Sequence, residues 1–156
     1  MGQNFIMPVN VDDLFDIVKS VWATVVEVEL ERVDPSETQH TEEDFLCAWM
    51  ELGGSWNGGL LLSCSHSLAV KAASIMYEVE ESMLGEEAVH DTIGELANMV
   101  AGSTKPLLPD DATLEQPDVL EESDLPEKCL SGWPQIYIAT KIDDDLLYVS
   151  FFKWDD

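Results

Sequence analysis

Residues 45–63 have the sequence FLCAWMELGGSWNGGLLLS. Two strand-like segments, Phe45–Leu52 and Trp56–Ser63, flank the pair Gly53-Gly54. A glycine pair between two such segments is typical of a β-hairpin, because glycine adopts the backbone angles that tight hairpin turns need. We therefore expect two antiparallel strands here.

Three helices are predicted around this hairpin. Apolar residues recur at three- and four-residue steps over residues 11–26, which predicts an amphipathic helix with Asn10 as its N-terminal cap. A second helix is expected directly after the hairpin, capped by Ser65 or Ser67. A third is expected over residues 86–102.

The C-terminal part of the chain contains further short strands. They are expected at Gln116–Leu120, Gln135–Ile142 and Leu146–Trp154. Helices and strand pairs thus come in blocks rather than in strict alternation. This order favours an α+β fold, a mainly antiparallel sheet packed against two or three helices. We expect a single domain over residues 1–156, with residues 1–10 as an N-terminal tail.

The charge of the chain is strongly unbalanced, with 32 acidic residues against 7 basic ones and a formal net charge of −25. Such a chain repels phosphate backbones and anionic lipids, so nucleic-acid binding and membrane-surface binding are disfavoured. The charge would attract a basic or metal-bearing partner, but an acidic surface also serves plain solubility.

Cysteine usage and the N-terminal sequence both indicate a cytoplasmic protein. Cys47, Cys64 and Cys129 form no CxxC pair and have apolar neighbours, which predicts reduced, buried thiols. The N-terminus has no positive region followed by an apolar stretch, so no signal peptide is expected. The apolar runs are too short for a membrane span.

The predicted helix over residues 86–102 has two different faces. Its apolar residues gather on one side of a helical wheel: Val89, Ile93, Leu96, Ala97 and Val100. Its polar face consists of Asp91, Glu95, Asn98 and Gly102. Gly94 and Gly102 flank this face, and because glycine costs a helix about 0.8–1 kcal/mol relative to alanine, we infer that they let another backbone approach closely. The alternative is a solvated outer face whose glycines serve core packing.

The segment 91–102, DTIGELANMVAG, resembles the signature helix of the CheX/CheC/FliY chemotaxis phosphatase family. That signature is Asp or Ser, three residues, Glu, two residues and Asn, and Asp91, Glu95 and Asn98 fit it. The order of the predicted elements also follows the family. CheC-type members carry two ExxN sites, whereas Asn98 is the one asparagine here with a glutamate three residues before it. The chain is therefore similar to CheX rather than CheC.

Two features depart from the family pattern. Pro117 lies nineteen residues after Asn98, short of the CheC interval, so it is given no functional role. Lys105-Pro106 follows the motif within two turns, where relatives continue the helix. Proline lacks an amide proton and clashes with the preceding turn, so it should end or kink the helix beyond the Glu95–Asn98 turn.

The resemblance implies a phosphatase that accelerates hydrolysis of the phospho-aspartate on a CheY-like response regulator. In this role Asn98 would position the attacking water and Glu95 would pair with a lysine of the receiver domain. Asp91, Gly94 and Gly102 would contact the partner. No cofactor is expected on this chain, whereas Mg²⁺ is expected on the response regulator. The alternative is a non-catalytic protein that binds a response regulator, or a scaffold similar to those of the flagellar switch.

The sequence supports a metal site less well than it supports the phosphatase site of residues 91–102. His90-Asp91 is similar to an HD metal pair, but neither His40 nor His66 stands in helical register with it. We therefore expect no metal site and a solvent-exposed His90. Asp143-Asp144-Asp145 lacks the spacing of a calcium loop and predicts a solvated turn between two strands.

The C-terminal segment Leu146–Trp154 is long, rich in aromatic residues and β-prone. As an exposed edge strand it would be prone to pair with other chains. We predict a homodimer joined through this strand or through Gln135–Ile142 beside it. The alternative is a central strand within one subunit.

Overall fold

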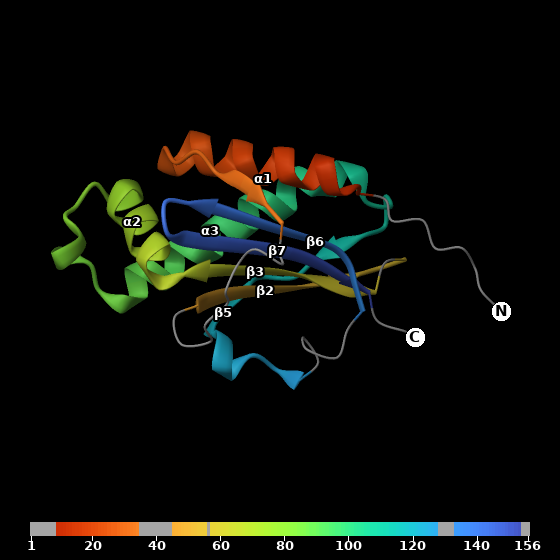
Figure 1. Ribbon diagram of the computed structural model, residues 1–156. Coiled ribbons are helices and arrows are strands. Elements are labelled where there is room, and N and C mark those ends of the chain that lie inside the picture. Colours follow the sequence, from red (N-terminus) through yellow and green to blue (C-terminus); the bar gives the residue numbers. More distant parts are fainter. Residues whose placement is uncertain (1–8, 35–44, 56, 128–132, 154–156) are drawn as a thin grey trace.

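An antiparallel sheet forms the framework of the protein (Figure 1). The computed structural model describes residues 9–34, 45–55, 57–127 and 133–153. Within them, seven strands lie in the order β1-β6-β7-β3-β2-β4, and β5 also pairs with β2. The helices and strands are α1 Val11–Val26, β1 Glu31–Val33, β2 Phe45–Gly53, β3 Gly58–Ser65, α2 His66–Tyr77, α3 Glu86–Thr104, β4 Thr113–Leu114, β5 Asp118–Glu121, β6 Trp133–Ile142 and β7 Asp145–Lys153. The predicted α+β class and single domain are confirmed.

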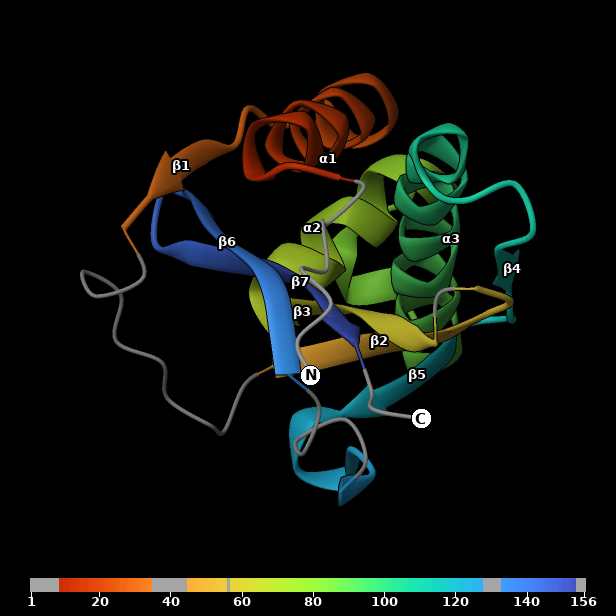
Figure 2. The same cartoon turned by 90° about the vertical axis from the view of Figure 1, so that its right-hand side faces the viewer.

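The three helices form a layer on one side of the sheet (Figures 1 and 2). α3 contacts α1 and α2 as well as β2 and β5, so it lies at the centre of this layer. α2 lies at one end of the sheet, next to α3 (Figure 1). The largest core cluster joins all three helices to the inner face of the sheet.

The limits of the helices follow from local chemistry. Asn10 caps α1 as predicted, because its Oδ1 accepts a hydrogen bond of 2.8 Å from the backbone N–H of Asp13. α3 ends at Thr104, and a 3₁₀ turn over Lys105–Leu107 follows it. This confirms that Pro106 terminates the helix.

Alternation along the strands divides the apolar residues between the two faces of the sheet. On β7, Leu147, Val149 and Phe151 belong to the core under the helices. Tyr148 and Phe152 point to the opposite face, where they join two smaller clusters. A period of two residues is what a strand with both faces partly buried requires.

The expectation that Leu146–Trp154 lies at an edge is wrong, and the alternative of a central strand is confirmed. β7 pairs with β3 on one side and with β6 on the other, so its backbone groups are satisfied within the sheet. The alternation that predicts this strand is the same at the edge and in the centre of a sheet.

The turn between β6 and β7 differs from the solvated turn expected from the sequence. Asp143 and Asp144 are exposed, but Asp145 is buried at the start of β7. Its carboxylate accepts hydrogen bonds from the hydroxyl of Ser67 and, at 2.8 Å, from Nζ of Lys71. Both donors lie on α2, so this buried carboxylate ties α2 to the strand turn.

The cap of α2 also differs from the prediction. Ser65 occupies the N-cap position but makes no side-chain cap hydrogen bond. Its hydroxyl instead exchanges hydrogen bonds with the backbone of Leu146, donating to the carbonyl and accepting from the amide. The short elements β1 and β4 escape sequence-based prediction because two or three residues carry no periodicity.

Several sequence-based predictions lie outside the described residues, among them the structure of residues 1–8 and the environments of Cys129 and Trp154. In the described part of the chain, none of the helices combines the length and the apolar character needed to cross a bilayer.

Candidate functional site

The residues singled out in the third helix form a polar stripe along α3, defined here as Asp91, Glu95, Asn98 and Gly102. Asp91, Glu95 and Gly102 are exposed, and Asn98 is half-buried. Spacings of four, three and four residues place them on one side of the helix, as predicted. The stripe ends at Gly102, two residues before α3 ends, so the proline that terminates the helix leaves it intact.

The rest of α3 is fixed in the protein core. Ile93, Leu96 and Val100 are fully buried under the neighbouring elements. Two buried threonines bond back to their own helix, Thr92 to the carbonyl of Ala88 at 2.9 Å and Thr104 to that of Ala101 at 2.8 Å. A helix whose opposite face is buried and whose buried hydroxyls are satisfied is a rigid platform for the polar stripe.

The two glycines of α3 have different surroundings. A Cβ atom added to Gly94 would lie 3.3 Å from Cγ2 of Val119 and 3.8 Å from Cγ of Pro117. Gly94 is therefore buried against Val119 of β5 and Pro117 of the same chain, so the expectation that it contacts a partner is wrong. Gly102 has no heavy atom within 4 Å of such a Cβ atom, so its surface is open to a partner.

Glu95 and Asn98 are available for chemistry with a partner. Among the described residues, neither the Glu95 carboxylate nor the Asn98 amide has a hydrogen bond or ion pair. The carboxylate offers acceptors and the amide offers both a donor group and an acceptor. One helical turn separates the two groups, about 5–6 Å between Cβ atoms.

His90 is not the exposed side chain that the sequence indicates. It is half-buried, and its Nε2 atom is buried without a hydrogen-bond partner among the described residues. The sequence analysis also set His66 apart from His90, because the two are not in helical register. In the structure, His66 at the start of α2 lines the same pocket as His90. No local pattern relates the two histidines, because they come together only through the packing of α2 on α3.

The described cysteines are structural. Cys47 and Cys64 are buried free thiols, as predicted. Burial, assisted by the negative charge of Asp145, raises the pKa of Cys64 well above its ordinary value. A buried thiol that keeps its proton is a poor nucleophile, so cysteine chemistry is not supported here. The same Asp145 carboxylate, mainly through its hydrogen bond, raises the pKa of Lys71.

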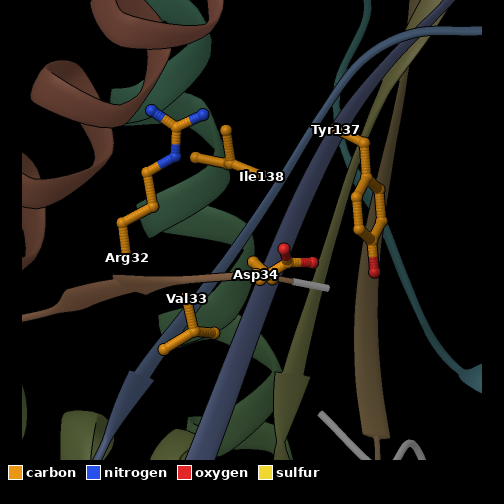
Figure 3. Close-up of a pocket in the computed structure, with 6 residues that line it drawn as sticks. Arg32, Val33, Asp34, Tyr137 and Ile138 are labelled. Atoms are coloured by element: carbon orange, nitrogen blue, oxygen red, sulfur yellow. The ribbon is translucent and has the colours of Figure 1, made fainter. Parts of the chain in front are cut away.

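A second pocket, of about 370 Å³, lies at the edge of the sheet between β1 and β6 (Figure 3). Arg32 and Val33 of β1 line one side, and Tyr137 and Ile138 of β6 line the other. Partial burial raises the pKa of Tyr137 to about 12, so its phenol stays protonated at neutral pH. Arg32 of this pocket forms an ion pair of 3.0 Å with Asp12 of α1, and the pocket lies away from the polar stripe of α3, so we do not regard it as the catalytic site.

A family model and several solved structures are similar to this chain. The family described as chemotaxis phosphatase CheX matches residues 46–141, which include all of α3. None of the curated proteins matches the sequence.

Three solved structures resemble the fold along most of its length. The chemotaxis protein CheX from Vibrio vulnificus has a TM-score of 0.75 at 20% identity, covering 95% of this chain and 99% of that one. A chain of the CheX-CheY-BeF3-Mg²⁺ complex from Borrelia burgdorferi has a TM-score of 0.71 at 16% identity, with 96% and 100% coverage. A CheC-like superfamily protein from a Shewanella species has a TM-score of 0.69 at 21% identity, with 92% and 96% coverage.

Proposed function

The chain belongs to the chemotaxis phosphatase CheX family, and we propose that it accelerates hydrolysis of the phospho-aspartate on a CheY-like response regulator through Glu95 and Asn98. The observation that carries this proposal is the polar stripe of α3. It presents a carboxylate and an amide to solvent on a helix whose opposite face is buried in the core. The stripe lies within the part of the chain that the family matches.

Asn98 is suited to positioning the attacking water. Its side-chain carbonyl accepts a hydrogen bond from the water, while its NH₂ group donates toward a phosphoryl oxygen. The water oxygen then attacks phosphorus in line as the bond to the aspartyl oxygen breaks, which regenerates the free carboxylate. A neutral amide holds this water without repelling the phosphoryl charge, as a carboxylate would.

Glu95 is suited to docking. The chain has a net charge of −25, so long-range attraction to an acidic receiver domain is absent. Binding must therefore rely on local contacts, and a lysine of the receiver beside the phosphorylated aspartate would pair with the Glu95 carboxylate. Asp91, one turn earlier, would extend the contact, and the open surface at Gly102 would let the receiver approach the far end of the stripe.

The receiver is expected to supply the Mg²⁺ that neutralises charge on the phosphoryl group, so none is required on α3. The solved complex of a CheX with a CheY, BeF3 and Mg²⁺ supports this choice of partner. Since response regulators of this kind act in the cytoplasm, the proposal also assigns the protein to that compartment.

The decisive experiment compares the decay of acyl phosphate on a CheY-like receiver with wild-type protein and with Asn98→Ala. The variant should fold normally, because Asn98 lies at the surface of α3. Its acceleration of acyl-phosphate decay should fall by a factor of about 10²–10³. Ser103→Ala is the matched control, an exposed residue of the same helix outside the stripe, and should keep full activity.

Two results would contradict the proposal. Equal acceleration by wild type and Asn98→Ala would exclude the water-positioning role. Binding of the phosphorylated receiver by the wild type without any acceleration of decay would favour the scaffold alternative.

A further inference from the structure

Four metal-binding side chains from three elements meet at one end of the α2–α3 packing. They are His66 at the start of α2, Glu86 and His90 in the first turns of α3, and Glu121 at the end of β5. Nε2 of His66 lies 2.8 Å from Oε2 and 3.1 Å from Oε1 of Glu121. Glu86, His90 and Glu121 each offer one potential ligand atom, and these three atoms lie within 4.8 Å of one another.

A pocket of about 260 Å³ opens beside these groups. His66, Glu86 and His90 line it, together with the carboxylate-bearing residue Glu81 and apolar residues such as Val70. This volume is large enough to admit a metal ion, since even one water occupies only roughly 30 Å³ of liquid.

The cluster is not explained by a simple ion pair. His66 and Glu121 satisfy each other, but Nε2 of His90 is left buried with no partner in the described part of the chain. The carboxylates of Glu86 and Glu121 also lie close together, which is unfavourable without a neighbouring positive charge. A cation between them would relieve this repulsion, and coordination by Nε2 would satisfy His90.

The donor set defines the kind of ion. Two imidazoles with two carboxylates suit a transition metal such as Zn²⁺, whereas Mg²⁺ and Ca²⁺ favour sites made of oxygen atoms alone. Tetrahedral Zn²⁺ with bonds of about 2.0–2.1 Å places its ligand atoms roughly 3.3 Å apart. The His66–Glu121 separation of 2.8 Å is close to this value. Glu86, His90 and Glu121 have ligand atoms within 4.8 Å of one another, so these side chains and His66 must rotate toward the ion when it binds.

We propose that His66, Glu86, His90 and Glu121 bind a divalent transition-metal ion of the Zn²⁺ class. The ion takes the place of the hydrogen bond between Nε2 of His66 and Glu121, whose proton is released to solvent. It joins α2, α3 and β5 at a single point. His90 lies five residues before Glu95, about 7.5 Å along the helix axis, so the metal site is separate from the Glu95–Asn98 pair. Four protein ligands leave no open position on a tetrahedral ion, so the role is structural.

Calorimetric titration of metal-free protein with ZnCl₂ tests the proposal. The buffer contains 150 mM NaCl and 5 mM MgCl₂, concentrations chosen to screen and occupy the acidic surface. We expect one equivalent of Zn²⁺ to bind and the thermal midpoint of unfolding to rise with Zn²⁺ concentration. Co²⁺ bound at the same site should give the visible absorption bands of a tetrahedral complex.

Variants identify the ligands. His90→Ala should weaken Zn²⁺ binding at least about 10-fold, because even the partners that orient metal ligands contribute 10–100-fold to affinity. Glu86→Gln keeps the size of an exposed side chain and should weaken binding similarly, so the test does not depend on one variant folding. Glu87→Gln is the matched control, an exposed carboxylate next to Glu86 outside the cluster, and should bind as the wild type does.

Absence of saturable Zn²⁺ binding by the wild type would overturn the proposal. Binding that is the same in wild type, His90→Ala and Glu86→Gln would also overturn it, because it would reflect the acidic surface in general.

Discussion

At the scale of single residues, the polar stripe of α3 combines a residue proposed for catalysis, Asn98, with residues proposed for docking, Glu95 and Asp91. Asn98 is half-buried at the surface of the helix, whereas Glu95 and Asp91 are exposed. An exposed charge contributes little to stability, so substitutions here should change the interaction with a partner more than the fold.

Glu95→Gln should weaken binding of the phosphorylated receiver, because the variant loses the negative charge but keeps the size of the side chain. The loss should shrink at higher salt, since ions screen an exposed ion pair. A binding titration at two salt concentrations measures both effects, with Glu87→Gln as the control on the same helix. Unchanged affinity would remove Glu95 from the docking role.

Gly102→Ala should separate stability from binding. Alanine is better than glycine in a helix by up to about 1 kcal/mol, and the added methyl group meets open space at this position. The free energy of unfolding should therefore rise in urea denaturation, while affinity for the receiver falls because its close approach is obstructed. An increase in stability with unchanged affinity would mean that the partner does not contact Gly102.

At the scale of elements, the hairpin of β2 and β3 depends on a close contact between an indole and a glycine. Trp49 of β2 covers Gly59 of β3, and a Cβ atom at Gly59 would lie 2.5 Å from Cη2 of the ring. The same ring packs edge-on against Phe152 of β7 with centroids 6.1 Å apart, so it has little room to move.

Gly59→Ala should therefore destabilise the protein by about 1–3 kcal/mol, the range for overpacking in a fixed core. Gly85→Ala is the matched control, since a Cβ atom there meets nothing within 4 Å. Urea unfolding measures both variants, and the penalty at Gly59 should shrink when Trp49 is replaced by leucine. A Gly59→Ala protein as stable as the wild type would show that the ring relocates freely.

At the scale of the whole molecule, the sheet retains an edge that suits a second copy of the chain. β1 pairs with β6 at Ala139, Thr140 and Lys141. Along the same side of β6, the stretch from Trp133 to Ile138 has no partner strand among the described residues. Tyr137 in this stretch is 44% exposed and stacks on Tyr148 of β7 with ring centroids 5.7 Å apart.

We predict a homodimer joined through β6, the second of the two strands that the sequence offered for this role. Light scattering at micromolar concentration should give twice the chain mass of 17.4 kDa. Salt should strengthen the association, because it screens the repulsion between two acidic chains.

Tyr137→Asp should produce monomers by placing a charge on the part of β6 that β1 does not cover. Tyr77→Asp, an equally exposed tyrosine on α2, should not. A mass of 17.4 kDa for the wild type would contradict the predicted dimer.

The sequence by itself determined the helices, the hairpin and the polar stripe of α3. These features depend on residues a few positions apart, such as Asn10 capping α1, Pro106 ending α3, and the spacing of Asp91, Glu95 and Asn98. Local hydrogen bonds and periodicity act within one element, so a single sequence contains the information.

Tertiary structure alone decided the central position of β7, the burial of Asp145 and the meeting of His66, His90 and Glu121. His66 and Glu121 are 55 positions apart, and Asp145 and Ser67 are 78 apart. Residues so far apart in the sequence form no local pattern. Their contacts form only when α2 packs on the turn between β6 and β7 and β5 pairs with β2. Strand order likewise reflects competition among many pairings of similar local chemistry, which only the packing of the complete core resolves.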